Sequence, residues 1–401
     1  MAAWAAITPA PAMKGFKSSF TYAAAARRLA EEGRRVINLT IGQPPEEPPG
    51  VLLEAVNRAV SRGYNKYSPS RGLGELRRAI AELERERLGV DVDPDNIVVT
   101  PGAKPALMLA MLMARRRPGR LLVLDPYFYA YVNQARLFGI EFETLPLMVA
   151  GGVYEFDVEG IVSRIESGRY SAVLLNTPHN PAGTLLSQGE MHEIVEAARR
   201  RKVLVISDEV YIDFTYEGEP ASLLKEGYGI YINSFSKSLF ITGWRIGYLI
   251  ADRETAELAA SLAANTYTCA PTPLQAAVAE HLVEAYHEAV KRIRELYPRR
   301  ASLLNDAFSH IPGVEMLRVR AGMFGFPLLD TEIAQAVGGV EEYARRLLEE
   351  KGVAVIPGHV FSDAYADRGF RVSLAASPEE IREAARLITE FNEELLAERR
   401  R

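Results

Sequence analysis

Lys237 lies between Ser236 and Ser238 in the segment SFSKS (residues 234–238), which directly follows the apolar run GIYIN. Arg245 follows eight residues later. A lysine amine attacks an aldehyde when burial or neighbouring cations lower its pKa, and an arginine binds a phosphate through two parallel hydrogen bonds. Most lysines of this kind are simply solvated, so the chemistry depends on partners elsewhere in the chain.

Polar or glycine-rich segments also follow four other apolar runs. They are PGAK after 96–100, PYFYAY after 120–125, TPHNPAG after 171–176 and DEVY after 203–207. Taken singly, each segment fits a turn, a helix cap or surface packing. Taken together, they supply a glycine loop at a helix start, aromatic rings, an asparagine, a carboxylate and a tyrosine.

The apolar runs alternate with segments whose apolar residues have helical spacing, such as GELRRAIAELERERLG. This pattern predicts an α/β fold, in which a mainly parallel sheet is flanked by helices. We expect a large domain over 51–285. An N-terminal arm with a loop (1–50) and residues 286–401, which mix short strands with helices, would form a smaller α+β domain.

The carboxyl ends of parallel strands meet at one edge of a sheet, where ligands bind. The five strand ends would therefore surround one crevice. A ligand that uses all of them needs a phosphate, a flat ring, a ring nitrogen that pairs with a carboxylate, an oxygen that accepts hydrogen bonds and an aldehyde. Pyridoxal 5′-phosphate has each of these groups.

The chain resembles the class I/II aminotransferases that depend on pyridoxal phosphate and have fold type I, of the aspartate aminotransferase kind. The motifs that carry the resemblance are LTIGQPP, YSPSRGLGELRRAIA, VVTPGAKPAL, NTPHNPAG, SDEVY, SFSKSLFITGWRIGY, VIPGHVF and FRVSLA. They occur in the family's order over most of the chain. Two positions depart mildly from the usual pattern: Ala182 replaces the threonine of N-P-T-G, and Phe128 stands where tryptophan or tyrosine is common.

The resemblance implies a set of site residues. The catalytic residues would be Lys237, Asp208 and Tyr211. The cofactor-binding residues would be Gly102, Ala103, Lys104, Phe128, Asn180, Asp208, Tyr211, Ser234, Ser236, Lys237, Arg245 and Tyr67. The substrate-binding residues would be Gly42, Asn180 and Arg371.

Five of these residues would act on the cofactor ring. Lys237 would hold the aldehyde and, once the substrate has displaced it, move a proton between substrate and cofactor. Asp208 would keep the ring nitrogen protonated. Tyr211 and Asn180 would donate to the phenolic oxygen, and Phe128 would stack on the ring face.

The phosphate would be held by Arg245, by the hydroxyls of Ser234 and Ser236, and by backbone N–H groups of Ala103 and Lys104 at a helix start. Ser234 is the stronger candidate of the two serines, by its position in the family motif.

Tyr67 matches a tyrosine that reaches the neighbouring subunit's phosphate in this family, so the resemblance implies a homodimer. Arg371 would clamp the substrate's α-carboxylate, close to the backbone of Gly42. The resemblance also implies cis peptides before Pro126 or Pro181, and His179 would at most support the site from behind.

Composition excludes several other classes. The formal net charge is −5 and the isoelectric point about 5.9, which gives no reason to expect nucleic-acid or anionic-membrane binding. No apolar run is long enough to span a membrane, and residues 1–15 lack the pattern of a signal peptide. Cys269 is the only cysteine, so a disulfide framework is impossible and a cytoplasmic location is favoured. The six histidines show no pairing typical of a metal site.

An amino acid aminotransferase, with 2-oxoglutarate as the expected acceptor, is the leading function. A β-eliminating lyase on the same scaffold is the alternative, because the two reactions share their first steps. A DNA-binding regulator with an aminotransferase-like body is disfavoured, since about 35 residues precede the loop at Gly42.

The amino donor stays open. Some dicarboxylate-specific members use a second arginine about 30–35 residues after the lysine, but residues 265–275 contain no basic residue. Another basic group could replace that arginine. The segment AGMFGF (321–326) could equally suit an apolar or aromatic side chain.

Overall fold

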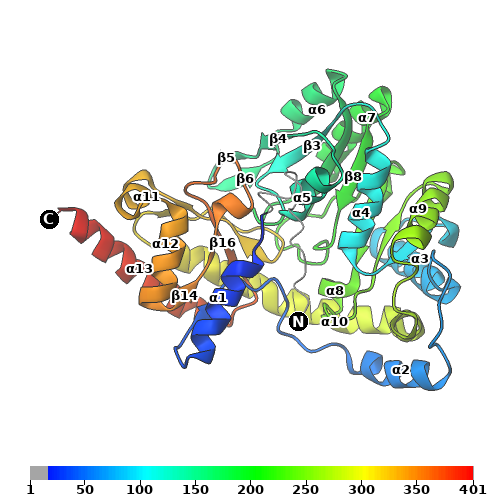
Figure 1. The fold of residues 1–401 in the computed structure, drawn as a ribbon, viewed down its shortest axis with the longest axis horizontal. Coiled ribbons are helices and arrows are strands. Elements are labelled where there is room, and N and C mark those ends of the chain that lie inside the picture. The colour runs from blue at the N-terminus through cyan, green and yellow to red at the C-terminus, as the bar shows by residue number, and fades with distance from the viewer. Residues whose placement is uncertain (1–16, 401) are drawn as a thin grey trace, which may run out of the picture.

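The computed structural model describes residues 17–400. The expectation that residues 1–15 are not a signal peptide concerns a segment outside this range. The described chain forms two connected parts: one contains the large sheet, and the other contains short strands and the C-terminal helices (Figure 1).

Seven strands form the large sheet. In spatial order they are β2 (Ile97–Thr100), β10 (Gly247–Ile250), β9 (Ile230–Ser234), β8 (Leu204–Asp208), β7 (Tyr170–Asn176), β3 (Arg120–Asp125) and β4 (Phe142–Pro146). All neighbours are parallel except that β10 is antiparallel to both β2 and β9. The predicted mainly parallel α/β sheet is therefore confirmed. The edge strand β4 was not predicted, because its residues are mostly half-buried and lack a continuous apolar run.

Helices and one hairpin surround the sheet. They are α2 (Gly50–Ser61), α3 (Gly74–Leu88), η2 (Pro94–Asn96), α4 (Ala103–Ala114), α5 (Ala130–Leu137), β5 (Met148–Ala150), β6 (Val153–Glu155), α6 (Val158–Glu166), α7 (Gln188–Arg201), η3 (Leu223–Glu226), α8 (Phe235–Ser238) and α9 (Arg253–Thr266). Most of the helices match segments predicted from helical spacing; α6 was not predicted.

Two buried hydrophobic clusters lie on opposite faces of the sheet where it is formed by β2, β10 and β9. Val98 and Leu249 pack in the cluster that contains α4, whereas Val99, Tyr231 and Tyr248 pack in the cluster that contains α3 and α10 (Thr272–Ser309). Successive side chains of a strand point to opposite faces, so one strand can serve both clusters. The polar atoms of Tyr231 and Tyr248 lie on the α3 side.

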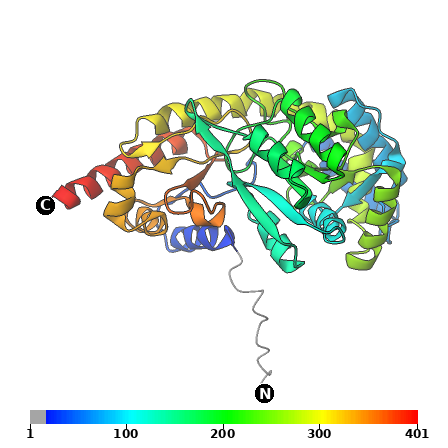
Figure 2. The same cartoon turned by 90° about the horizontal axis from the view of Figure 1, so that it is seen from above.

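The helix α10 runs from the large sheet into the second part (Figures 1 and 2). The second part contains β11 (Val314–Glu315), β12 (Phe324–Gly325), β13 (Leu328–Leu329), α11 (Thr331–Val337), α12 (Val340–Arg346), η4 (Leu347–Lys351), β14 (Val353–Ala354), β15 (Ile356–Pro357), η5 (Gly358–Val360), β16 (Phe370–Ser373) and α13 (Pro378–Arg400). Because α10 crosses residues 285 and 286 as helix, the domain boundary expected there stays a prediction.

The N-terminal segment joins the second part. After α1 (Phe20–Glu31), the strand β1 (Ile37–Asn38) pairs in parallel with β14, where Ile37 is opposite Val353. This pairing places the following loop, with Gly42, between the two parts of the molecule. Within residues 17–400, no helix is long and apolar enough to cross a membrane.

Candidate active site

The carboxyl ends of β2, β9, β8, β7 and β3 lie at one edge of the sheet, since these five strands run in the same direction. Asp208 is the last residue of β8 and pairs in register with Asn176, the last residue of β7. Ser234 ends β9, and Gly102 precedes α4 after β2. Strand pairing therefore gathers segments that are more than a hundred residues apart in the chain.

Lys237 lies on the short helix α8, and its Nζ donates to the carbonyl oxygen of Gly42. Burial, and after it the positive charges of Arg371, Arg245 and Lys104, together lower the pKa of Lys237 to about 7. A substantial fraction of this amine is therefore uncharged at neutral pH, which is the form that acts as nucleophile or base.

Asp208 is buried, and its carboxylate accepts a hydrogen bond from the hydroxyl of Tyr131 at 2.8 Å. Burial raises the pKa of Asp208 to about 6, while the bonds from Tyr131 and from the Val210 N–H oppose this rise. Asn176 donates through Nδ2 to the Asp208 carbonyl at 2.8 Å and accepts from the N–H of Asn180 at 2.7 Å. Asp208 and Asn180 are thus held in one rigid unit.

Tyr131 was not among the residues predicted from the sequence. It lies three residues after Phe128, so the start of α5 places both rings on the same side, with centroids 5.6 Å apart in an edge-to-face arrangement. The i, i+3 spacing of the two aromatics was the one available signal. The bond to Asp208 could not be deduced, because it joins residues 77 positions apart.

Arg371 is buried and stacks between two aromatic rings. Its guanidinium carbon lies 4.0 Å from the Phe324 ring centroid and 4.5 Å from that of Phe361. The two terminal nitrogens donate to the Thr40 carbonyl at 3.0 Å and to Asn180 Oδ1 at 3.5 Å.

The Nε atom of Arg371 is buried without a hydrogen-bond partner within the described chain, and burial lowers the pKa of Arg371 to about 10. No carboxylate in residues 17–400 forms an ion pair with it. A buried cation of this kind suits an anionic ligand.

A compact cup forms where Gly102 meets Arg245. The φ of Gly102 is +88°, and a Cβ atom there would lie only 2.2 Å from the Arg245 Nη2 atom, so only glycine fits without displacing the guanidinium. Arg245 donates through Nη1 to the hydroxyl of Ser236 at 3.3 Å. The Ser234 hydroxyl lies 2.8 Å from that of Ser236. The helix α4 begins at Ala103, so its first N–H groups lack intrahelical partners here.

Two other predicted residues, Lys104 and Tyr211, lie around the strand-end site. The Nζ of Lys104 lies 5.2 Å from the ring centroids of both Phe128 and Tyr129 and 3.4 Å from the Tyr129 hydroxyl. The buried phenol of Tyr211 has a pKa raised by desolvation, and its ring meets that of Phe324 edge-on at 5.9 Å. The structure therefore brings the Lys104 side chain, not only its backbone, to the site.

Two predicted residues lie apart from the centre. Tyr67 is 86% exposed and has no hydrogen bond to the cup within the described chain. His179 is buried, and burial lowers its pKa to about 3; its Nδ1 lies 3.3 Å from the N–H of Ala182. A neutral His179 therefore supports the loop that carries Asn180. The peptides before Pro126 and Pro181 are both cis, as expected.

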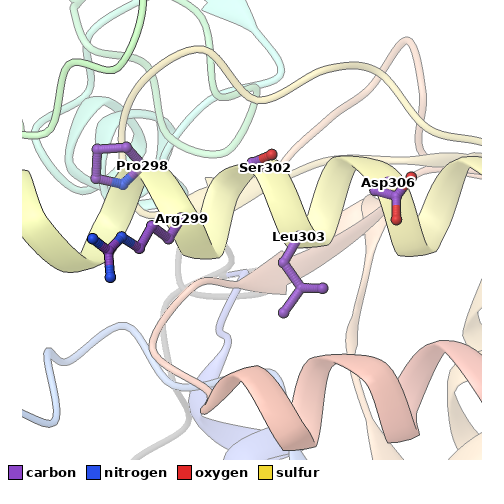
Figure 3. Close-up of a pocket in the computed structure, with 5 residues that line it drawn as sticks. All are labelled: Pro298, Arg299, Ser302, Leu303 and Asp306. Atoms are coloured by element: carbon purple, nitrogen blue, oxygen red, sulfur yellow. The ribbon is translucent and has the colours of Figure 1, made fainter.

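A surface hollow elsewhere shares no residue with the strand-end site. It lies on α10 and is lined by Pro298, Arg299, Ser302, Leu303 and Asp306 (Figure 3). In the close-up, Leu303 points toward α13. Within residues 17–400, no group of three or more histidine, cysteine or acidic side chains could hold a metal ion.

Comparisons with known proteins agree with this geometry. The family model for aminotransferase class I and II matches residues 34–388. The chain is 32% identical to the aspartate aminotransferase of Sulfurisphaera tokodaii, covering 95% of this chain and 96% of that protein. It is 33% identical to the probable aspartate/prephenate aminotransferase of Aquifex aeolicus, covering 94% and 96%.

Solved structures give the same result. The aspartate aminotransferase of Thermus thermophilus, solved with maleate, superposes with a TM-score of 0.87 at 30% identity, covering 96% of this chain and all of that one. Fold, site geometry and sequence similarity together place this chain in the aminotransferase class I and II family.

Proposed function

We propose that this aminotransferase moves the amino group of an acidic L-amino acid to 2-oxoglutarate, with pyridoxal 5′-phosphate as the carrier, in a ping-pong cycle. One observation carries the proposal: Lys237, whose pKa is about 7, lies between two unlike anion sites, the Arg245 cup and the buried Arg371. One site suits the cofactor's phosphate and the other the substrate's α-carboxylate.

The residues present fit pyridoxal phosphate. Arg245, Ser236, Ser234 and the N–H groups at the start of α4 would hold the phosphate. Asp208 would pair with the ring nitrogen, Tyr211 and Asn180 with the phenolic oxygen, and Phe128 with the ring face. The glycine-only contact between Gly102 and Arg245 supports a cup for a compact anion.

When bound, pyridoxal phosphate supplies an aldehyde for the amino group and a ring that withdraws electrons from the substrate's Cα. The chain's own residues move and hold the protons. Lys237, partly uncharged at neutral pH, would take the proton from the substrate's Cα and deliver it to the cofactor, and would move a proton in the opposite direction in the second half of the cycle. Asp208, with a pKa of about 6, is mostly ionised at pH 7 and so can accept a hydrogen bond from a protonated ring nitrogen.

Arg371 would orient the substrate through its α-carboxylate. Its stacking between Phe324 and Phe361 and its bond to Thr40 fix the plane of the guanidinium. A fixed plane permits two parallel hydrogen bonds to a carboxylate, which sets the direction of the Cα–H bond. The free Nε shows that the donor capacity of this side chain is not used up within the protein.

An acidic donor and acceptor are supported by Lys104. No carboxylate in residues 17–400 forms an ion pair with its ammonium, which lies against Phe128 and contributes to the lowered pKa of Lys237. It can therefore take the place of the arginine that is missing from 265–275. The relatives described above are named for aspartate, and the Thermus thermophilus structure contains maleate, a dicarboxylate.

A homodimer is proposed on the resemblance and on Tyr67, whose 86% exposure leaves its hydroxyl available to a second copy. A cytoplasmic location remains part of the proposal, because the chain has a single cysteine and so no disulfide framework.

The test is spectroscopic. The purified chain with added pyridoxal phosphate should absorb visible light, and borohydride should bleach the band and fix the cofactor on Lys237, as peptide mass spectrometry would show. Aspartate or glutamate should remove the band without an acceptor, and 2-oxoglutarate should restore it. A colourless protein, or cofactor fixed on another lysine, would contradict the proposal.

Lys237→Ala is the matched variant. It should bind the cofactor without a covalent bond and lose turnover by at least about 10⁴-fold, the upper range for one general acid–base group. Release of pyruvate and ammonia from a cysteine-like substrate, with no acceptor consumed, would favour the β-eliminating lyase instead.

A further inference from the structure

A buried ion cluster, made of charged side chains, lies on the face of the large sheet that α3 and α10 cover. Its members are Glu84, Arg87 and Asp213, whose side chains are at most 7% exposed. Arg87 forms two ion pairs: its Nη2 lies 2.6 Å from Glu84 Oε1, and its Nη1 lies 3.4 Å from Asp213 Oδ2. The Tyr286 hydroxyl donates to Asp213 at 2.6 Å. None of these side chains was predicted to take part in the reaction.

The ion cluster is joined to strand β9 through Tyr231. Its hydroxyl lies 3.2 Å from Glu84 Oε1 and 2.7 Å from an Arg87 nitrogen. Asn233 lies two residues further along β9, on the same face, and its Nδ2 donates to the Tyr231 hydroxyl at 2.6 Å. Asn233 is only 3% exposed, so water has little access to this bond.

Asn233 then contacts the backbone of the proposed cofactor segment. Its Oδ1 accepts from the N–H of Ser234 at 2.7 Å. The parallel neighbour β8 ends at Asp208, opposite Ile232, and the Ile232 carbonyl accepts from the N–H of Glu209. The Ser234 N–H points to the same side as that carbonyl but lies beyond the end of β8, so the sheet offers it no partner. The Asn233 side chain supplies one.

Ser234 in turn starts the helix that carries Lys237. Its hydroxyl caps α8 by accepting from the N–H of Ser236 at 3.1 Å. The Ser236 hydroxyl in turn accepts a hydrogen bond from Arg245 Nη1 at 3.3 Å. Lys237 follows within the same turn. The orientation of the Ser234 backbone therefore sets both the phosphate cup and the direction of the lysine.

We propose that Asn233 is a positioning residue, which ties the segment 234–237 to the buried ion cluster through Tyr231 and so holds Lys237 and the phosphate cup in place. The inference rests on the proposed function, because it concerns how the cofactor is held. Glu84, Tyr231, Asn233 and Ser234 form one continuous hydrogen-bonded path from α3 to the site.

The test compares Asn233→Ala with Asn392→Ala. Asn392 is as deeply buried, accepts from the Tyr343 hydroxyl at 2.9 Å and donates to the Pro312 carbonyl at 2.7 Å, but lies on α13 far from the cup. Both changes should lower the unfolding temperature of the cofactor-free chain. Only Asn233→Ala should also weaken pyridoxal phosphate binding, by about tenfold or more, and displace the pH midpoint of the visible band.

Tyr231→Phe tests the same path with the ring packing kept. It removes the acceptor of Asn233 Nδ2 and should move cofactor affinity and band midpoint in the same direction as Asn233→Ala, by a smaller factor. This variant keeps the inference testable if Asn233→Ala does not fold.

Equal cofactor affinity and equal band midpoint in wild type, Asn233→Ala and Tyr231→Phe would overturn the inference and leave the proposed function intact. Failure of the wild-type chain to bind pyridoxal phosphate would overturn both.

Discussion

The Tyr131 hydroxyl donates to the buried carboxylate of Asp208 across 2.8 Å, and this bond opposes the rise in the pKa of Asp208 that burial causes. The carboxylate therefore stays ionised in a place where desolvation alone would favour the neutral acid. An aromatic side chain from α5 thus adjusts the acidity of a carboxylate at the end of β8.

Tyr131→Phe should raise the pKa of Asp208, because the bond that stabilises its ionised form is lost. The acidic limb of the kcat/KM profile should move to higher pH by about one pH unit, with smaller losses at pH 8 than at pH 6. Tyr154→Phe is the control, since it also removes a buried hydroxyl bond, to the Phe326 carbonyl at 3.0 Å. An acidic limb that stays in place would show that Tyr131 does not tune Asp208.

Lys104→Gln should raise KM for aspartate and 2-oxoglutarate by about 10- to 100-fold and leave KM for alanine nearly unchanged, because only the dicarboxylates use its charge. The loss of this nearby positive charge should also raise the pKa of Lys237 and move the midpoint of the visible band to higher pH. The exposed Lys225→Gln variant serves as control. Equal losses with every donor would argue against a role in substrate choice.

Arg371→Lys should weaken all amino acid donors alike, by about 10-fold or more in KM, because the ammonium keeps the charge but lacks the planar pair of donors. The variant also loses stacking on Phe324 and Phe361. Steady-state kinetics with aspartate, glutamate and alanine, beside the exposed Arg318→Lys variant, measures this effect. A loss confined to dicarboxylates would reverse the proposed roles of Arg371 and Lys104.

Glu209→Gln should remove a pH dependence of stability. Burial raises the pKa of Glu209 from 4.5 to about 8, and its Oε2 is buried without a partner in the described chain. Between these pH values the folded chain holds a proton that the unfolded chain has released, so stability falls as pH rises from about 4.5 to about 8.

The Glu209→Gln variant cannot lose that proton. The free energy of unfolding of the variant, relative to that of wild type, should therefore be higher at pH 9 than at pH 5, on the order of a few kcal/mol. Denaturant unfolding of the cofactor-free protein at the two pH values gives the difference, and the exposed Glu393→Gln variant should show none. An unchanged difference for Glu209→Gln would mean that Glu209 is ionised in the folded state.

The sequence predicted the α/β sheet and the segments at its strand ends, because a strand buried on both faces needs a continuous apolar run and a ligand segment needs polar residues just after it. It did not show β4, whose exposed edge needs no such run. It also did not show that β10 is antiparallel, since strand direction depends on the path of the connection rather than on side-chain pattern.

The residue types at the site were also readable from the sequence, since Lys237, Asp208, Arg245 and Arg371 lie in local motifs. Their states were not. The pKa of Lys237, the bond from Tyr131 to Asp208 and the place of Arg371 between two rings all arise from desolvation and contacts between segments distant in the chain. Local sequence specifies which groups are present, and only tertiary packing decides how much water and which charges surround them.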